Sequence, residues 1–169
     1  MEIERKWLVE GWPDMCGEPV MCQEMEQGYL VVRPTVRIRK EQIIGRDPEY
    51  ILCIKSGGGL AREEIEVAVS EEKYNDIRRV IARPMIRKER RTYAVSDGLH
   101  LEVNLVDQGT DTQFMYAEIE FDTIEAAKAW HSDSEELSEY LKREVTDDPG
   151  QSMGAYWIRT READGIRRN

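Results

Sequence analysis

The chain opens with three charged side chains at alternate positions, Glu2, Glu4 and Lys6. Successive side chains point to opposite faces of a β-strand, so an extended segment places these three on one face, whereas a helix would direct Glu2 and Glu4 to nearly opposite sides. Two carboxylates beside an ammonium suit Mg²⁺ together with an anion, because this ion is often held jointly by carboxylates and phosphates. A solvent-facing edge strand in a Glu-rich chain explains the same pattern, so the remaining strands must decide.

The same alternation recurs along the chain, with charged side chains on one face of each segment and mainly apolar ones on the other. Gly, Pro, Asp and Asn separate the segments, as expected for turns between strands. The acidic stretch 10–26, which contains two prolines, is predicted to be a long connector. From the period of two we predict eight strands, at residues 2–9, 27–33, 35–41, 49–56, 62–69, 85–94, 99–107 and 114–121.

Two helical patterns interrupt or follow these strands. The first covers residues 71–83 and begins after Ser70, a residue type that caps helix N-termini. The second covers residues 123–131, and the tail from residue 134 onward is helical in pattern but broken at Pro149 and Gly150. We therefore predict one domain over residues 1–169, with a helical tail over about 123–169.

Eight antiparallel strands tend to close into a barrel, because closure removes the unpaired strand edges. The apolar faces would then lie outside, under the helices, and the charged faces would line the interior. The predicted fold is α+β and mostly antiparallel β: a closed eight-stranded β-barrel that forms a tunnel with a polar interior, with helices packed on the outside.

The predicted interior holds six cations and seven carboxylates. Burying so many charges without water would cost several kcal/mol per ion, so the cavity must be wet or hold a charged ligand. Arginine and lysine bind a polyanion, while clustered carboxylates hold a metal ion that bridges it to water, and a compact anion with several phosphoryl groups fits best. The predicted tunnel-lining residues are Lys6, Arg37, Arg39, Lys55, Lys88 and Arg90, with Glu2, Glu4, Glu64, Glu66, Glu102, Glu118 and Glu120, and with Asn104 beside them.

Composition excludes several other classes of protein. The net charge of −10 and the pI near 4.8 argue against nucleic acid as a partner. No apolar run of about 18 residues is present, so we expect no membrane partner and a cytoplasmic location, with which three cysteines without a disulfide or zinc spacing agree. His100 and His131 lack partners at metal-ligand spacing and are interpreted as surface residues. The sequence leaves a monomer and a homodimer both open.

Motifs in a fixed order resemble those of the CYTH, or triphosphate tunnel metalloenzyme, family. They are Glu-x-Glu-x-Lys at 2–6, Gln27-Gly28-Tyr29-Leu30, Arg37-x-Arg39, Lys55, Arg62-x-Glu64-x-Glu66, Lys88-x-Arg90-x-x-Tyr93, Glu102, Glu118-x-Glu120 and Glu144-Val145-Thr146.

The resemblance implies an enzyme that hydrolyses inorganic triphosphate with Mg²⁺ or Mn²⁺. A nucleoside or thiamine triphosphatase, an adenylate cyclase, or a non-catalytic module that binds polyphosphate or nucleotides remain alternatives. Many family members carry Glu-x-Asp where this chain has Glu102-x-Asn104, which removes one charge. By position, the resemblance assigns catalysis to Lys6, Tyr29 and Glu4, phosphate binding to Lys6, Arg37, Arg39, Lys55, Lys88 and Arg90, and metal binding to Glu2, Glu4, Glu102, Glu118 and Glu120.

Overall fold

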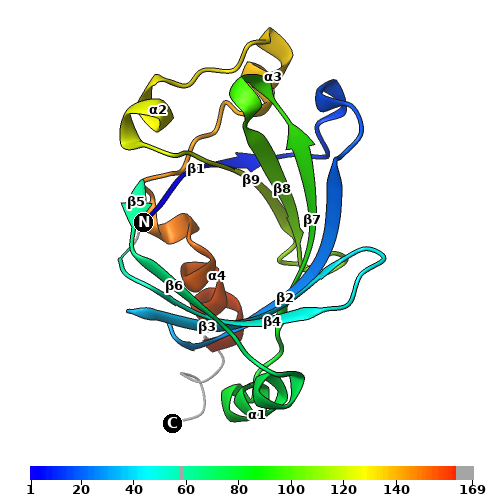
Figure 1. Ribbon diagram of the computed structural model, residues 1–169, viewed down its shortest axis with the longest axis vertical. Coiled ribbons are helices and arrows are strands. Elements are labelled where there is room, and N and C mark those ends of the chain that lie inside the picture. The colour runs from blue at the N-terminus through cyan, green and yellow to red at the C-terminus, as the bar shows by residue number, and fades with distance from the viewer. Residues whose placement is uncertain (58, 163–169) are drawn as a thin grey trace.

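A single antiparallel sheet curls into a barrel (Figure 1). The structure, a computed structural model, describes residues 1–57 and 59–162, so the last seven residues of the predicted helical tail lie outside the described part. Neighbouring strands follow the order β5-β1-β9-β8-β7-β2-β3-β4-β6. The strands are β1 (Glu2–Val9), β2 (Met21–Val31), β3 (Thr35–Ile43), β4 (Glu49–Lys55), β5 (Ala61–Arg62), β6 (Glu64–Ala68), β7 (Ile86–Ala94), β8 (His100–Val106) and β9 (Phe114–Glu120).

The described residues form nine strands, not the eight predicted, because the predicted strand 62–69 divides at Glu63. β5 pairs with β1 at Glu2 and Ile3, whereas β6 pairs with β4 on the opposite side of the sheet. One short stretch of chain thus joins both ends of the sheet and closes the barrel. The prediction of a closed antiparallel barrel is confirmed, and the strand count was wrong because one strand changes partners midway.

The predicted connector 10–26 was wrong at its end, since β2 begins at Met21. This part of β2 pairs with β7 on one side and with β3 on the other. Gln23 and Met25 are buried on the inner face, and Glu24 points outward. The outer face of this part of β2 is acidic, whereas the outer faces of most other strands are mainly apolar. The sequence pattern therefore did not indicate a strand here, although pairing with two neighbours stabilises one.

Helix α1 (Glu71–Ile81) covers the outer face of β2, β3 and β4. The side chain of Ser70 accepts a hydrogen bond from the backbone N–H of Lys73 at 3.2 Å, which is the predicted cap. Tyr74 is buried against Ile38 in a core between the helix and the sheet. A Cβ at Gly28 would lie 2.6 Å from the sulfur of Met85, so a larger residue there would force the Met85 side chain to move.

The outer face of β1, β8 and β9 forms a second core, which the tail covers. Trp7 and Trp130 pack with their ring centroids 6.1 Å apart, and Leu137 and Leu141 complete the layer. The covering elements are α2 (Ile124–Ala129) and α3 (Glu135–Tyr140), both shorter than predicted for the tail. None of the helices in the described part of the chain has the length and apolar character needed to cross a bilayer.

After α3 the chain returns to the barrel and runs beside β1. The backbone N–H of Val145 donates to the carbonyl of Lys6 at 2.8 Å, and that of Leu8 donates to the carbonyl of Arg143 at 3.0 Å. A break at Pro149 follows, as the sequence predicted, and then α4 (Met153–Trp157) and a π-helical turn (Ile158–Glu162). Trp157 is fully buried against Tyr29, with 5.6 Å between ring centroids, so this segment is fixed to the barrel.

Candidate active site

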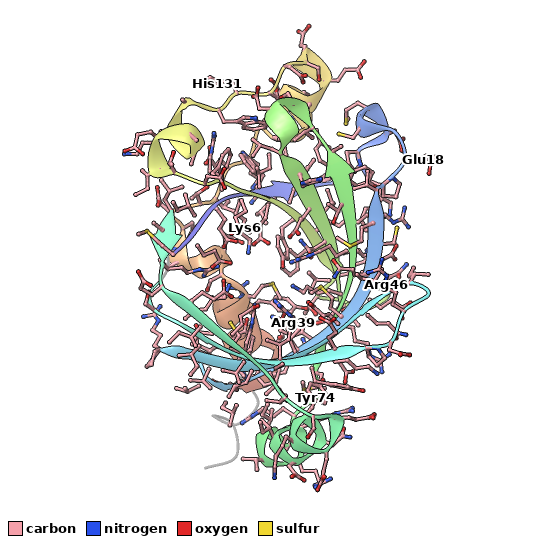
Figure 2. The ribbon with its side chains drawn as sticks, in the orientation of Figure 1. Lys6, Glu18, Arg39, Arg46, Tyr74 and His131 are labelled. Carbon is pink, nitrogen blue, oxygen red and sulfur yellow. The ribbon has the colours of Figure 1, made fainter. Side chains whose placement is uncertain are left out.

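The barrel encloses a cavity of about 1260 Å³. All thirteen charged residues predicted for the interior line it, together with Tyr29, Tyr116 and Arg62. Figure 2 shows Lys6 and Arg39 pointing into this space from β1 and β3, on opposite sides of the barrel. His100 and His131 are exposed, and Figure 2 places His131 outside the barrel, as their interpretation as surface residues requires.

One wall of the cavity, formed by β1, β9 and β8, is acidic. The strand register pairs Glu4 with Glu120, Lys6 with Glu118, and Glu118 with Glu102. Residues directly opposite each other on antiparallel strands have Cβ atoms about 5 Å apart, so these carboxylates are close neighbours. We call Glu2, Glu4, Glu102, Glu118 and Glu120 the acidic wall.

Neighbours on the acidic wall have opposite effects on two carboxyl groups. Burial and the charge of Glu118 raise the pKa of Glu4 to about 7, although Arg62 opposes the rise. Burial also disfavours ionisation of Glu118, but Lys6 and Arg90 outweigh it and hold its pKa below the ordinary value. Glu118 therefore carries the more stable negative charge, while Glu4 titrates near neutral pH.

A second part of the cavity lining, on β3, β4 and β7, is basic. Arg37 is buried, and its Nε has no hydrogen-bond partner among the described residues. Arg39 forms ion pairs with Glu41 and Glu66, both at 3.0 Å. A buried guanidinium N–H without a partner is costly, so Arg37 is suited to an anionic ligand in the cavity. We call Arg37, Arg39, Lys55, Lys88 and Arg90 the basic wall.

Asn104, predicted beside the tunnel-lining residues, lies on β8 opposite Arg90 and is not among the residues that line the cavity. It is fully buried, and its Oδ1 accepts a hydrogen bond from Nε of Arg90 at 3.0 Å, while Glu102 forms an ion pair with the same guanidinium at 2.8 Å. One neutral and one charged acceptor thus orient Arg90. The amide in place of the family's usual Asp leaves this guanidinium with one fewer negative neighbour.

Arg62, which the sequence analysis named in a family motif but did not place in the tunnel, lines the cavity. Its guanidinium donates to Glu2 at 2.6 Å and also pairs with Glu4. Lys55 approaches Glu2 from the other side at 2.9 Å. The signal was present in the sequence, because Arg62 has the same parity as Glu64 and Glu66, whose side chains line the cavity.

The tyrosine against the Lys6 ammonium is Tyr116, whose ring centroid lies 4.0 Å from Nζ. The hydroxyl of Tyr29, which the resemblance assigned to catalysis together with Lys6, instead accepts a hydrogen bond from Gln27 at 3.0 Å and faces Arg37. Tyr116 has the same parity as Glu118 and was missed because only charged residues were followed along that strand.

Among the described residues, the group whose possible ligand atoms have metal-ligand spacing lies on β4 and β6, apart from the acidic wall. One ligand atom each from Cys53, Glu64 and Glu66 lies within 4.8 Å of the others. Glu64 already pairs with Lys55 at 3.0 Å and accepts from the Cys53 thiol at 3.2 Å, and Glu66 pairs with Arg39. A thiol and two paired carboxylates suit Mg²⁺ less well than the oxygen donors of the acidic wall.

Comparison with known proteins shows to which family the chain belongs. No family model matches the chain. The inorganic triphosphatase of Nitrosomonas europaea is 33% identical over 131 residues, which cover 76% of this chain and 82% of that protein. The chain belongs to the CYTH, or triphosphate tunnel metalloenzyme, family.

Solved structures of similar proteins agree with this membership in the CYTH family. The crystal structure of the inorganic triphosphatase NE1496 matches with a TM-score of 0.59 and 25% identity, over 92% of this chain and 93% of that one. The PH1819 protein from Pyrococcus horikoshii matches with a TM-score of 0.61 and 19% identity, over 86% of this chain and 94% of that one. The second likeness concerns the fold alone.

Proposed function

We propose that this protein hydrolyses inorganic triphosphate in its tunnel with the help of Mg²⁺ or Mn²⁺. One observation carries the proposal: the acidic wall and the basic wall line one and the same cavity. An ion pair network built only for stability would gain little from this arrangement, because buried charges are costly. The 33% identical relative from Nitrosomonas europaea is an inorganic triphosphatase, which favours the same substrate here.

The basic wall would bind the phosphate groups that are not transferred. Arg37 and Arg39 are neighbours on one face of β3 and can each hold phosphate oxygens with a bidentate fork. Lys88 and Arg90 on β7 approach from a different direction, so the anion would be held from two sides. This arrangement fixes the terminal phosphoryl group toward the acidic wall.

The acidic wall fits a divalent cation, because its donors are carboxylate oxygens and because they repel one another. The raised pKa of Glu4, caused by burial and by Glu118, reports that repulsion. A bound Mg²⁺ or Mn²⁺ would neutralise charge on the terminal phosphoryl group and hold the attacking water. Glu2, Glu4, Glu118 and Glu120 would hold the ion, with Glu102 beside them.

Side chains of the protein would then orient the attacking water and stabilise the charge on the phosphoryl oxygens. Glu4, as a ligand of the ion, would orient the attacking water beside it. Lys6 lies on the same face two residues on and would stabilise charge on the phosphoryl oxygens. Tyr29, to which the resemblance assigns a catalytic role, would assist proton transfer.

The rival substrates are nucleoside and thiamine triphosphates, and the rival class is a binding module without turnover. A substrate panel separates them: phosphate release is measured from triphosphate, ATP and thiamine triphosphate, with Mg²⁺, with Mn²⁺ and with excess chelator. We expect triphosphate with metal to be hydrolysed fastest. Glu118→Gln should lower the rate at least about 100-fold. Glu89→Gln, on the outer face, should retain the wild-type rate. Full turnover in chelator, or binding without any phosphate release, would contradict the proposal.

We also propose that the protein acts in the cytoplasm. The three cysteines are all free thiols, which reducing compartments maintain. Fractionation of cells that express a tagged chain would test the location.

A further inference from the structure

Tyr116 connects two lysines that belong to different strands. The Nζ atom of Lys6 on β1 lies 4.0 Å from the centroid of its ring, and the Nζ atom of Lys88 on β7 donates to its hydroxyl at 3.0 Å. Tyr116 itself lies on β9, between those strands, and only 1% of its surface is exposed. The ring therefore stands between two ammonium groups that both line the cavity.

Stacking and backbone pairing fix the position of the Tyr116 ring. Phe114 stacks on it with a centroid distance of 5.8 Å and an interplanar angle of 27°. Its backbone is paired on both sides, with Leu8 of β1 and with Asn104 of β8. A rigid aromatic ring in a sheet is a fixed reference point, whereas a lysine side chain has several freely rotating bonds.

Lys88 depends on this contact more than Lys6 does. Within residues 1–57 and 59–162, the hydroxyl of Tyr116 is the one hydrogen-bond acceptor that Lys88 Nζ contacts. Burial lowers the pKa of Lys88 well below its ordinary value, and Arg90, Arg37 and Arg39 lower it further, while Glu118 opposes them. An ammonium has three N–H donors, so two remain for a ligand once the first is bound to Tyr116.

A purely structural role would not require the hydroxyl. Tyr116 belongs to an apolar cluster with Phe114 and Trp157, where a phenylalanine would pack equally well. The cation at the ring face and the donor at the hydroxyl are two separate polar contacts, one to each lysine. These contacts are what distinguish a residue that orients the lysines from one that only fills space.

We propose that Tyr116 is a positioning residue that holds the ammonium groups of Lys6 and Lys88 at a fixed separation, so that each contacts a different phosphoryl group of the substrate. The inference rests on the proposed function, because it assumes that both lysines bind triphosphate. The ring orients Lys6 through its face, and the hydroxyl orients Lys88 through the hydrogen bond.

The test is a double-mutant cycle on triphosphate affinity, measured by calorimetry in chelator so that turnover does not interfere. Tyr116→Phe removes the contact to Lys88 but keeps the ring, and we expect the Kd for triphosphate to rise about fivefold. In a Lys88→Met background the same substitution should change the Kd less than about twofold, because its partner is gone. Tyr116→Leu also removes the ring face and should weaken binding further in both backgrounds.

Tyr156→Phe is the matched control. Tyr156 is also buried, and the substitution removes its hydrogen bonds to Asp107 and Thr112, which do not line the cavity. It should lower the melting temperature and leave the Kd unchanged. Equal effects of Tyr116→Phe with and without Lys88, or an unchanged Kd in both, would overturn the inference while wild-type binding keeps the proposed function intact. Failure of the wild-type protein to bind triphosphate would overturn both.

Discussion

Glu4→Gln and Glu118→Gln make the same substitution on adjacent strands of the acidic wall, and we expect them to change stability in opposite directions. Glutamine has nearly the shape of glutamate and mimics its neutral form. The comparison therefore isolates the free energy of keeping each carboxylate ionised inside the barrel.

The effect at Glu4 follows from its pKa. Burial, Glu118 and Glu2 raise this pKa from the ordinary 4.5 to about 7, with 17% of the side chain exposed. Between those pH values the folded state binds more protons than the unfolded state, so stability falls as the pH rises. At about 1.4 kcal/mol for each factor of ten, ionised Glu4 costs about 3 kcal/mol above pH 7. Glu4→Gln removes this cost.

Glu118 has the opposite sign. Burial opposes its ionisation, but Lys6 and Arg90 hold its pKa below the ordinary value. Its contribution to stability is therefore present above pH 4.5 and is lost as the pH falls through the lower pKa of the folded state. Glu118→Gln leaves two buried cations with less compensation, so the variant should be less stable than wild type at pH 8.

Urea unfolding of the three proteins at pH 5 and pH 8, in chelator and without phosphate, measures both effects. For Glu4→Gln we expect a gain of less than about 1 kcal/mol at pH 5 that grows to about 3 kcal/mol at pH 8. Both variants should lose metal-dependent hydrolysis. Only Glu4→Gln should therefore combine a gain in stability with a loss of activity. A destabilised Glu4→Gln at pH 8, or a gain that is the same at both pH values, would refute the reasoning.

Three further predictions follow from the two faces of the strands. Arg39→Ala should weaken triphosphate binding by about tenfold or more, whereas Arg5→Ala, which loses its outer-face bonds to Glu144 and to the carbonyl of Trp130, should lower the melting temperature and leave affinity unchanged; calorimetry showing equal losses of affinity would mean that the facing is wrong. Tyr29→Phe should lower kcat by about tenfold with little change in KM if its hydroxyl moves a proton, and an unchanged kcat would reduce Tyr29 to packing. Triphosphate with Mg²⁺ at 100 times its Kd should stabilise the fold by about 2.7 kcal/mol and raise the melting temperature by several degrees, more than sulfate at equal ionic strength; equal shifts in wild type and Arg39→Ala would argue against one enclosed site.

Local alternation was sufficient to predict most of the barrel and its charged lining. Side chains two residues apart on a strand share a face whatever the strand pairs with, so Glu2, Glu4 and Lys6 were placed together from sequence alone. The same rule would have found Arg62 and Tyr116, had it been applied to every residue of those strands. The closed barrel followed from the number of strands, because unpaired edges are unfavourable.

Pairing between distant segments could not be read from the sequence. The strand divides at Glu63 because β1, which lies far away in the chain, pairs with the part before it, while β4 pairs with the part after it. β2 begins at Met21 because β7, also distant in the chain, and β3 flank it. Both features depend on partners that local composition does not identify.

The electrostatic character of each site residue was likewise decided by the tertiary structure. Glu4 and Glu118 are the same residue type with the same alternation, yet the pKa of Glu4 is raised and that of Glu118 is lowered. The difference arises because Lys6 and Arg90 outweigh burial at Glu118, whereas at Glu4 burial and the charges of Glu118 and Glu2 outweigh Arg62. The sequence determined which side chains face the tunnel, and only the fold, by setting their neighbours and their burial, determined the charge that each one carries there.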